Sequence, residues 1–224
     1  MDIRVLTSFK PIRKGTTRLK NTRRTNRFKT LALIALVIIL SLTGYKLYTH
    51  NKKRNKQELS EISIQVSKNP YFLQTDKRWA KDKIGGSNET VAQVGCTISC
   101  VAMSLTHKGF KVTPKDLNKK LKSARGYTSR GWLKWYTIQK LTNSKFKVYV
   151  PRHFNNLLID KLLLEKKDII AKIMINGFIS HWVLIVGKQS YQYLVKDPLE
   201  SSKEIIKISK YNSKIYSIRW IEKS

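Results

Sequence analysis

An uncharged apolar run near the start of the chain, TLALIALVIILSLTGY at Thr30–Tyr45, is the feature that most constrains the fold. Core helices have a polar face, and this run has none, which favours a helix surrounded by lipid over one buried in a globular core. If Lys46 extends its side chain to the interface, the stretch reaches about 19 residues, close to the ~20 that cross a bilayer. We therefore predict a transmembrane helix over residues 30–48.

Basic residues flank this run on both sides and indicate its orientation. Residues 1–29 contain ten Lys or Arg and one acidic residue, while Lys46 and four more basic residues up to position 56 follow the run. By the positive-inside tendency, the N-terminal tail stays cytoplasmic and the remainder of the chain is exported. A cleaved signal peptide is the rival interpretation, but the basic region is long and no small-residue cleavage pattern follows.

The charge of the chain extends well beyond the tail. The formal net charge is +31, and the residues after position 48 account for +21 of it. Such a surface would gather on anionic polymers, among them the phosphates of a cell wall. The sequence contains no recognised nucleic-acid module, and an exported domain rarely meets nucleic acid, so we expect no nucleic-acid partner.

Helical patterns precede strand patterns in the C-terminal part of the chain. The predicted helices cover 96–108, 114–121, about 130–141 and 155–167. The predicted strands cover 145–150, 168–174, 181–188, 191–197, 203–209 and 215–221. This order predicts an α+β domain in which N-terminal helices pack on a mostly antiparallel sheet.

Gly95-Cys96 opens the helical pattern CTISCVAMSLTHKG. A thiol in the first turn of a helix lies near unpaired N–H groups and the positive end of the helix dipole, which stabilise a thiolate. Cys100 follows one turn later, which is poor geometry for a disulfide, and we interpret it as a small core residue. No spacing of Cys or His matches a structural metal site, so we expect neither a metal nor another cofactor.

His181 is the best candidate for a base beside this thiol. It begins the apolar strand pattern HWVLIVGK, and Asp197 ends the next pattern, YQYLVKD. For Asp197 to lie on the same face as His181 it must pair near Val183, which requires an odd-numbered loop or a β-bulge near Gly187. A plain two-residue turn would place the acid on the other face. The sequence predicts a triad of Cys96, His181 and Asp197 on an irregular hairpin.

Four pieces of the chain, in this order, resemble a known family: YFLQTDKRWA, VAQVGCTISCVAMSL, SHWVLIVGK and YLVKDP. They are similar to the papain-like cysteine peptidases that process bacteriocins, the double-glycine peptidases, and more closely to a stand-alone C39-like branch. The resemblance covers about Tyr71 to Pro198. It implies a papain-like fold with Cys96 as nucleophile, His181 as general base and acid, and Asp197 as its orienter.

The resemblance also implies an oxyanion hole formed by the side chain of Gln74 and the backbone N–H of Cys96. Bacteriocin-processing members carry this glutamine six residues before the cysteine, where this chain has Thr90, whereas the stand-alone branch places it farther upstream. Gln93 is a rival donor. Gly95 would let the backbone pass close to substrate in the cleft, although a turn at the start of the helix also explains a glycine there.

Together these features predict a membrane-anchored, extracytoplasmic cysteine peptidase that hydrolyses amide bonds through a thioester. The expected organisation is a basic cytoplasmic tail (1–29), a transmembrane helix (30–48), a polar stalk (49–68) and the peptidase domain (69–224). Two alternatives stay open: a peptidoglycan amidase or endopeptidase with the same triad, and a catalytically silent basic binding protein of the cell envelope. The expected partners are a peptide or peptidoglycan substrate, the membrane, and an anionic cell-wall polymer.

Overall fold

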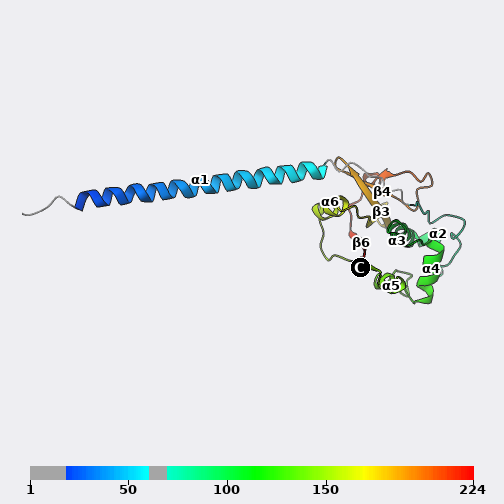
Figure 1. The fold of residues 1–224 in the computed structure, drawn as a ribbon. Helices are drawn as coiled ribbons and strands as arrows, with labels where there is room; N and C mark the ends of the chain where they lie inside the picture. Colours follow the sequence, from blue (N-terminus) through cyan, green and yellow to red (C-terminus); the bar gives the residue numbers. More distant parts are fainter. Residues whose placement is uncertain (1–18, 61–69) are drawn as a thin grey trace, which may run out of the picture. The chain divides into compact units, whose positions relative to one another are not determined.

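The computed structural model describes residues 19–60 and 70–224 (Figure 1). The predictions for residues 1–18 of the tail and 61–68 of the stalk lie outside the described residues. The chain divides into two compact units whose boundary falls at Asn55.

The first unit consists, in its described part, of helix α1 (Leu19–Ser60), which continues past the boundary. Within it, Phe28–Lys53 is long and apolar enough to cross a membrane. At a rise of 1.5 Å per residue this stretch is about 39 Å long, more than the ~30 Å of a hydrocarbon core. None of its most apolar window is buried inside the protein, so it is not a core helix. The stretch includes the predicted span at 30–48.

The second unit is built on a six-stranded sheet in the order β1-β6-β2-β3-β4-β5, in which every neighbouring pair is antiparallel. The prediction of a mostly antiparallel sheet that follows helices is confirmed. The strands are β1 (Phe146–Tyr149), β2 (Ile169–Ile175), β3 (Ile179–Gln189), β4 (Gln192–Lys196), β5 (Ile206–Lys207) and β6 (Ser217–Lys223).

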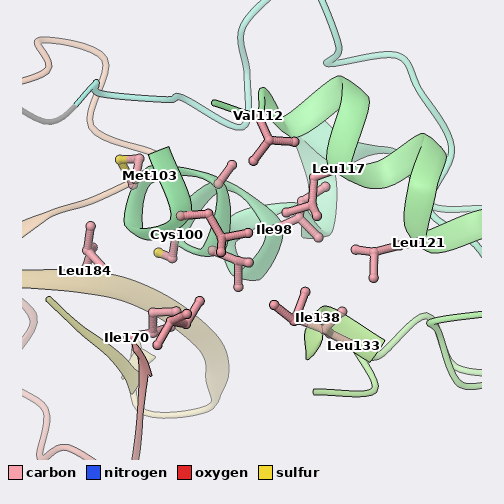
Figure 2. Packing of buried hydrophobic residues seen from close by; sticks show 14 of the residues in the cluster. Ile98, Cys100, Met103, Val112, Leu117, Leu121, Leu133, Ile138, Ile170 and Leu184 are labelled. Atoms are coloured by element: carbon pink, nitrogen blue, oxygen red, sulfur yellow. The ribbon is translucent and has the colours of Figure 1, made fainter. Parts of the chain in front are cut away.

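Four helices share one apolar cluster with the sheet: α2 (Val91–Val94), α3 (Cys96–His107), α4 (Pro114–Ser123) and α5 (Tyr136–Leu141). Figure 2 shows the α3 side chains in the middle of this cluster, between α4 and the sheet residues Ile170 and Leu184. Each fully buried aliphatic side chain contributes about 1.5–3 kcal/mol through the hydrophobic effect. Burial among these neighbours therefore holds α3 rigidly against the sheet.

A second apolar cluster includes helix α6 (Asn156–Leu164) and the short 3₁₀ helix η1 (Ile208–Tyr211). Val183 and Ile185 of β3 belong to this second cluster, whereas Leu184, which lies between them in the sequence, belongs to the first cluster. Successive strand residues point to opposite faces, so β3 is buried on both sides. Helices thus cover both faces of the sheet (Figure 1).

Two elements differ from the sequence prediction. The helix expected from about residue 130 begins only at Tyr136. Before it, Tyr127 and Leu133 form a β-bridge around a turn in which Gly131 has a φ of 77°, a conformation that a helix does not contain. The strand predicted over 203–209 is reduced to the two residues of β5, because the chain then enters η1.

The hairpin of β3 and β4 contains the irregularity that the triad requires. Its strands are joined by a two-residue turn, and the register shifts by one residue between Ile185 and Gly187. Beyond this shift Leu184 pairs with Lys196, so the next residue along the chain, Asp197, falls opposite Val183, on the face that His181 shares. Of the two irregularities that the sequence allowed, the bulge near Gly187 is present and the odd-numbered loop is not.

Candidate active site

Cys96 is the first residue of α3 and follows a short helix, α2 (Val91–Val94), that the sequence analysis did not predict. Gly95 joins the two helices. A Cβ atom at Gly95 would lie 2.4 Å from the carbonyl oxygen of Val91, so only glycine allows this junction. Close packing therefore explains the glycine, and its contribution to a substrate cleft stays a prediction.

His181 and Asp197 form a buried pair beside this junction. The Nε2 atom of His181 lies 2.6 Å from the Oδ1 atom of Asp197, and each residue is only 3% exposed. Leu199 donates its backbone N–H to the same Oδ1 atom at 2.8 Å. Because the carboxylate engages Nε2, the other ring nitrogen of His181, Nδ1, is the one left for the thiol of Cys96.

The charges of this site support one another. Burial lowers the pKa of His181, but hydrogen bonds with Asp197 and Cys96 more than offset it and raise the pKa from 6.5 to about 9. Burial raises the pKa of Asp197, yet its hydrogen bonds with His181, Tyr211 and Leu199 outweigh burial and leave the pKa below its usual value. At neutral pH the arrangement therefore favours an imidazolium between a carboxylate and the thiol.

Gln74 lies near the start of α3 although it is far from Cys96 in the sequence. Its side chain is 2% exposed, and its Nε2 atom donates to the carbonyl oxygen of Ala92 in α2 at 2.7 Å. Gln93, the rival donor, is exposed, and its Oε1 atom accepts the backbone N–H of Thr90 at 2.8 Å as a cap of α2. The structure brings Gln74, and not the side chain of Gln93, into the protein interior at this junction.

Cys100 has the opposite environment from that of a reactive thiol. It is 0% exposed, its Sγ atom lies 3.4 Å from the carbonyl oxygen of Trp182, and burial raises the pKa of its thiol well above the usual value. A buried thiol held neutral in this way is inert. Its interpretation as a small core residue is confirmed (Figure 2).

Two tyrosines complete the surroundings of Asp197, and the sequence analysis missed both. The hydroxyl of Tyr211 donates to the Oδ2 atom of Asp197, and the hydroxyl of Tyr71 accepts the backbone N–H of Asp197 at 2.8 Å. Tyr71 is separated from the acid by 126 positions, and Tyr211 lies between two predicted strands, in a stretch for which the sequence predicted no element. No local pattern in the sequence could have assigned either residue to the site.

The helix with a cysteine at its start, packed on an antiparallel sheet that carries the histidine, defines a papain-like fold. The chain belongs to the Peptidase C39 family, whose model matches residues 88–218. This region includes Cys96, His181 and Asp197, whereas Gln74 precedes it. Membership in the family indicates a cysteine peptidase with a peptide substrate.

The solved structures that are similar include one described as a "putative C39-like peptidase" from Bacillus anthracis. It is 14% identical in sequence, the similarity covers 73% of this chain and 99% of that one, and the TM-score is 0.47. A search among curated proteins gives no significant match.

Proposed function

We propose that this chain is a membrane-anchored, extracytoplasmic cysteine peptidase with Cys96 as nucleophile, His181 as base and acid, and Asp197 as the residue that orients the histidine. The observation that carries the proposal is the buried 2.6 Å contact between His181 and Asp197 beside a thiol at the start of a helix. The raised pKa of His181, about 9, supports a thiolate–imidazolium pair at neutral pH.

The proposed reaction is an acyl transfer. In the resting ion pair the thiol proton of Cys96 already lies on the Nδ1 atom of His181, and the thiolate attacks the carbonyl carbon of the scissile amide. His181 then gives the proton to the leaving amine, and water activated by the same histidine hydrolyses the thioester. Asp197 holds the imidazole in one tautomer throughout and stabilises its positive charge.

An oxyanion hole formed by Gln74 and the backbone N–H of Cys96 fits the same geometry. One hydrogen of the Gln74 amide is donated to Ala92, which fixes the position of this amide, and its second hydrogen has no hydrogen-bond partner among the residues that the structure describes. A preorganised donor of this kind contributes about 10²–10³-fold to the rate of acyl transfer. Gly95, next to the nucleophile, would line the substrate cleft.

The long apolar helix and the basic tail support an anchor with the catalytic domain outside the cytoplasm. In this proposal residues 30–48 span the membrane and residues 69–224 form the peptidase domain. Protease added to intact cells should digest the catalytic domain and spare an N-terminal tag, whereas digestion of the tag alone would contradict this orientation.

The charge of the exported part favours a second candidate, hydrolysis of peptide bonds in peptidoglycan. Residues after position 48 carry a net charge of +21, which would hold the enzyme on anionic wall polymers. Digestion of a peptide library and of purified cell walls, each compared with Cys96→Ala, separates the two substrate classes. Equal cleavage by the wild type and by Cys96→Ala would contradict the proposed nucleophile. Absence of wild-type activity on both substrates would contradict the proposed peptidase function.

A further inference from the structure

Both carboxylate oxygens of Asp197 are engaged, and they have different partners. The Oδ1 atom faces the Nε2 atom of His181 and accepts the backbone N–H of Leu199. The Oδ2 atom accepts the hydroxyl of Tyr211. A carboxylate is free to rotate about its Cβ–Cγ bond, so a separate donor at each oxygen selects one orientation.

The position of Tyr211 is fixed independently of its hydroxyl. The residue ends η1, and Asn212, with a φ of 45°, turns the chain away directly after it. The Tyr211 ring packs against the second apolar cluster, and its centroid lies 6.4 Å from that of His181. A phenylalanine at this position would retain the packing and lose only the donor.

The backbone at Asp197 is held by a different residue. The hydroxyl of Tyr71 accepts the N–H of Asp197 at 2.8 Å and donates to the carbonyl oxygen of the same residue at 3.0 Å. Gln74 donates its backbone N–H to the carbonyl oxygen of Pro198 at 2.9 Å. Removal of the Tyr211 hydroxyl therefore leaves this turn in place and removes only the donor to the Oδ2 atom of the carboxylate.

We propose that Tyr211 is a positioning residue of the active site: its hydroxyl fixes the carboxylate of Asp197 so that Oδ1 faces His181. The inference rests on the proposed triad, because it assigns Tyr211 a role through Asp197. The same hydrogen bond stabilises the ionised carboxylate, which in turn stabilises the imidazolium of His181. Without it, the thiolate of Cys96 loses part of its counter-charge.

The test compares two tyrosine variants of the full chain, Tyr211→Phe and Tyr193→Phe. Tyr193 is a matched control because its hydroxyl also donates to a buried carboxylate, that of Asp160, at 3.0 Å, on another part of the unit. The readout is the rate of alkylation of Cys96 by iodoacetamide as a function of pH, mapped by peptide mass spectrometry. This measurement needs no substrate, and it separates Cys96 from the buried Cys100.

We expect Tyr211→Phe to lower the alkylation rate of Cys96 at neutral pH by about 10-fold, the loss typical of one hydrogen bond to a charged group. The onset of alkylation should also move to higher pH. Tyr193→Phe should retain the wild-type pH profile. A wild-type profile in Tyr211→Phe, or an equal shift in both variants, would overturn the inference.

The wild-type protein provides a second measurement in case Tyr211→Phe does not fold. The hydroxyl proton of Tyr211 should be protected from exchange with water in proton NMR spectra and lose this protection in Asp197→Ala. Rapid exchange in the wild type would overturn the inference. If Cys96 of the wild type reacts no faster than in His181→Ala, the proposed triad itself fails; if it does react faster, a negative Tyr211 result removes only the positioning role.

Discussion

Each end of α3 lies beside a histidine–aspartate pair, and the two pairs have different surroundings. At the N-terminal end, His181 and Asp197 lie 2.6 Å apart, and the thiol of Cys96 is the third group. At the C-terminal end, His107 and Asp168 lie 2.7 Å apart. Eleven residues of helix separate these ends, about 16 Å at 1.5 Å per residue.

What differs is the third partner and the burial of the histidine. The side chain of His181 is 4% exposed, whereas that of His107 is 32% exposed. The third group at the C-terminal end is the ammonium of Lys108, 3.5 Å from Asp168. A histidine–carboxylate pair alone therefore does not mark a candidate active site: among the described residues, the N-terminal pair lies beside a thiol, whereas the C-terminal pair lies beside an ammonium group.

The largest effect should come from removing the thiol. Cys96→Ala should lower amide hydrolysis by on the order of 10³-fold or more, because no other group in the site can form the thioester. Cys100→Ala, one turn farther along α3, should retain activity and lose only stability through the small cavity it creates. The measurement is the rate of peptide hydrolysis. Full activity in Cys96→Ala would contradict the role of Cys96 as the nucleophile at the N-terminal end of α3.

Replacing each histidine tests the comparison directly. His181→Ala should reduce the rate of hydrolysis by on the order of 10³-fold, since the thiolate loses its proton acceptor and counter-ion. His107→Ala should leave the rate within about two-fold, because its carboxylate partner lies at the far end of α3. Equal loss of activity in both variants, with both still folded by circular dichroism, would contradict the difference between the two histidines.

Replacing the two aspartates should affect different properties: Asp197 the rate of hydrolysis, and Asp168 the stability of the fold. Asp197→Asn should lower the rate of hydrolysis by about 10- to 100-fold, an effect typical of residues that orient a functional histidine. Asp168→Asn should leave the rate unchanged and lower the free energy of unfolding by about 1–3 kcal/mol, because it weakens a buried hydrogen-bonded group. Urea unfolding and kinetic assays on both variants check this, and a slow but stable Asp168→Asn enzyme would contradict it.

The smallest predicted change is a shift in pH dependence. The reactive imidazolium of His181 is present below its pKa of about 9 and is lost as the pH rises through that value. The stability that the raised pKa provides is fully present below pH 6.5, the usual value, and disappears over the same rise. Hydrolysis should therefore decline above about pH 9 in the wild type. In Asp197→Asn the decline should begin at lower pH, and an identical alkaline decline would contradict the assigned electrostatics.

Local chemistry explains why much of the fold was predictable. The apolar period of α3, the Thr113 N-cap that accepts the Asp116 backbone N–H, and the apolar alternation of β3 each act within a few residues. The bulge in the β3–β4 hairpin was predictable only as a condition, because it follows from where Asp197 must lie. The prediction followed from the need for one extra residue to bring Asp197 onto the face of His181, and not from any residue that favours a bulge.

The rest of the site depends on contacts that the sequence does not encode locally. Tyr71 and Tyr211 contact Asp197 from the N-terminal and the C-terminal side of it in the sequence, and Gln74 meets α2 only through tertiary packing. The prediction of a helix from about residue 130 was wrong at its start, because Gly131 adopts a positive φ. The spacing of apolar residues gives no sign of this conformation. Long-range packing decides these features, and it overrides local preference.

The central claim is that Cys96 is a nucleophile activated by His181, and covalent labelling tests it most directly. The full chain is treated with a peptidyl vinyl sulfone, which reacts with activated thiolates, and the modified residue is identified by peptide mass spectrometry. We expect modification of Cys96 alone in the wild type, its loss in His181→Ala and its retention in His107→Ala. Modification of Cys100, or equal modification of Cys96 in the wild type and in His181→Ala, would contradict activation of Cys96 by His181.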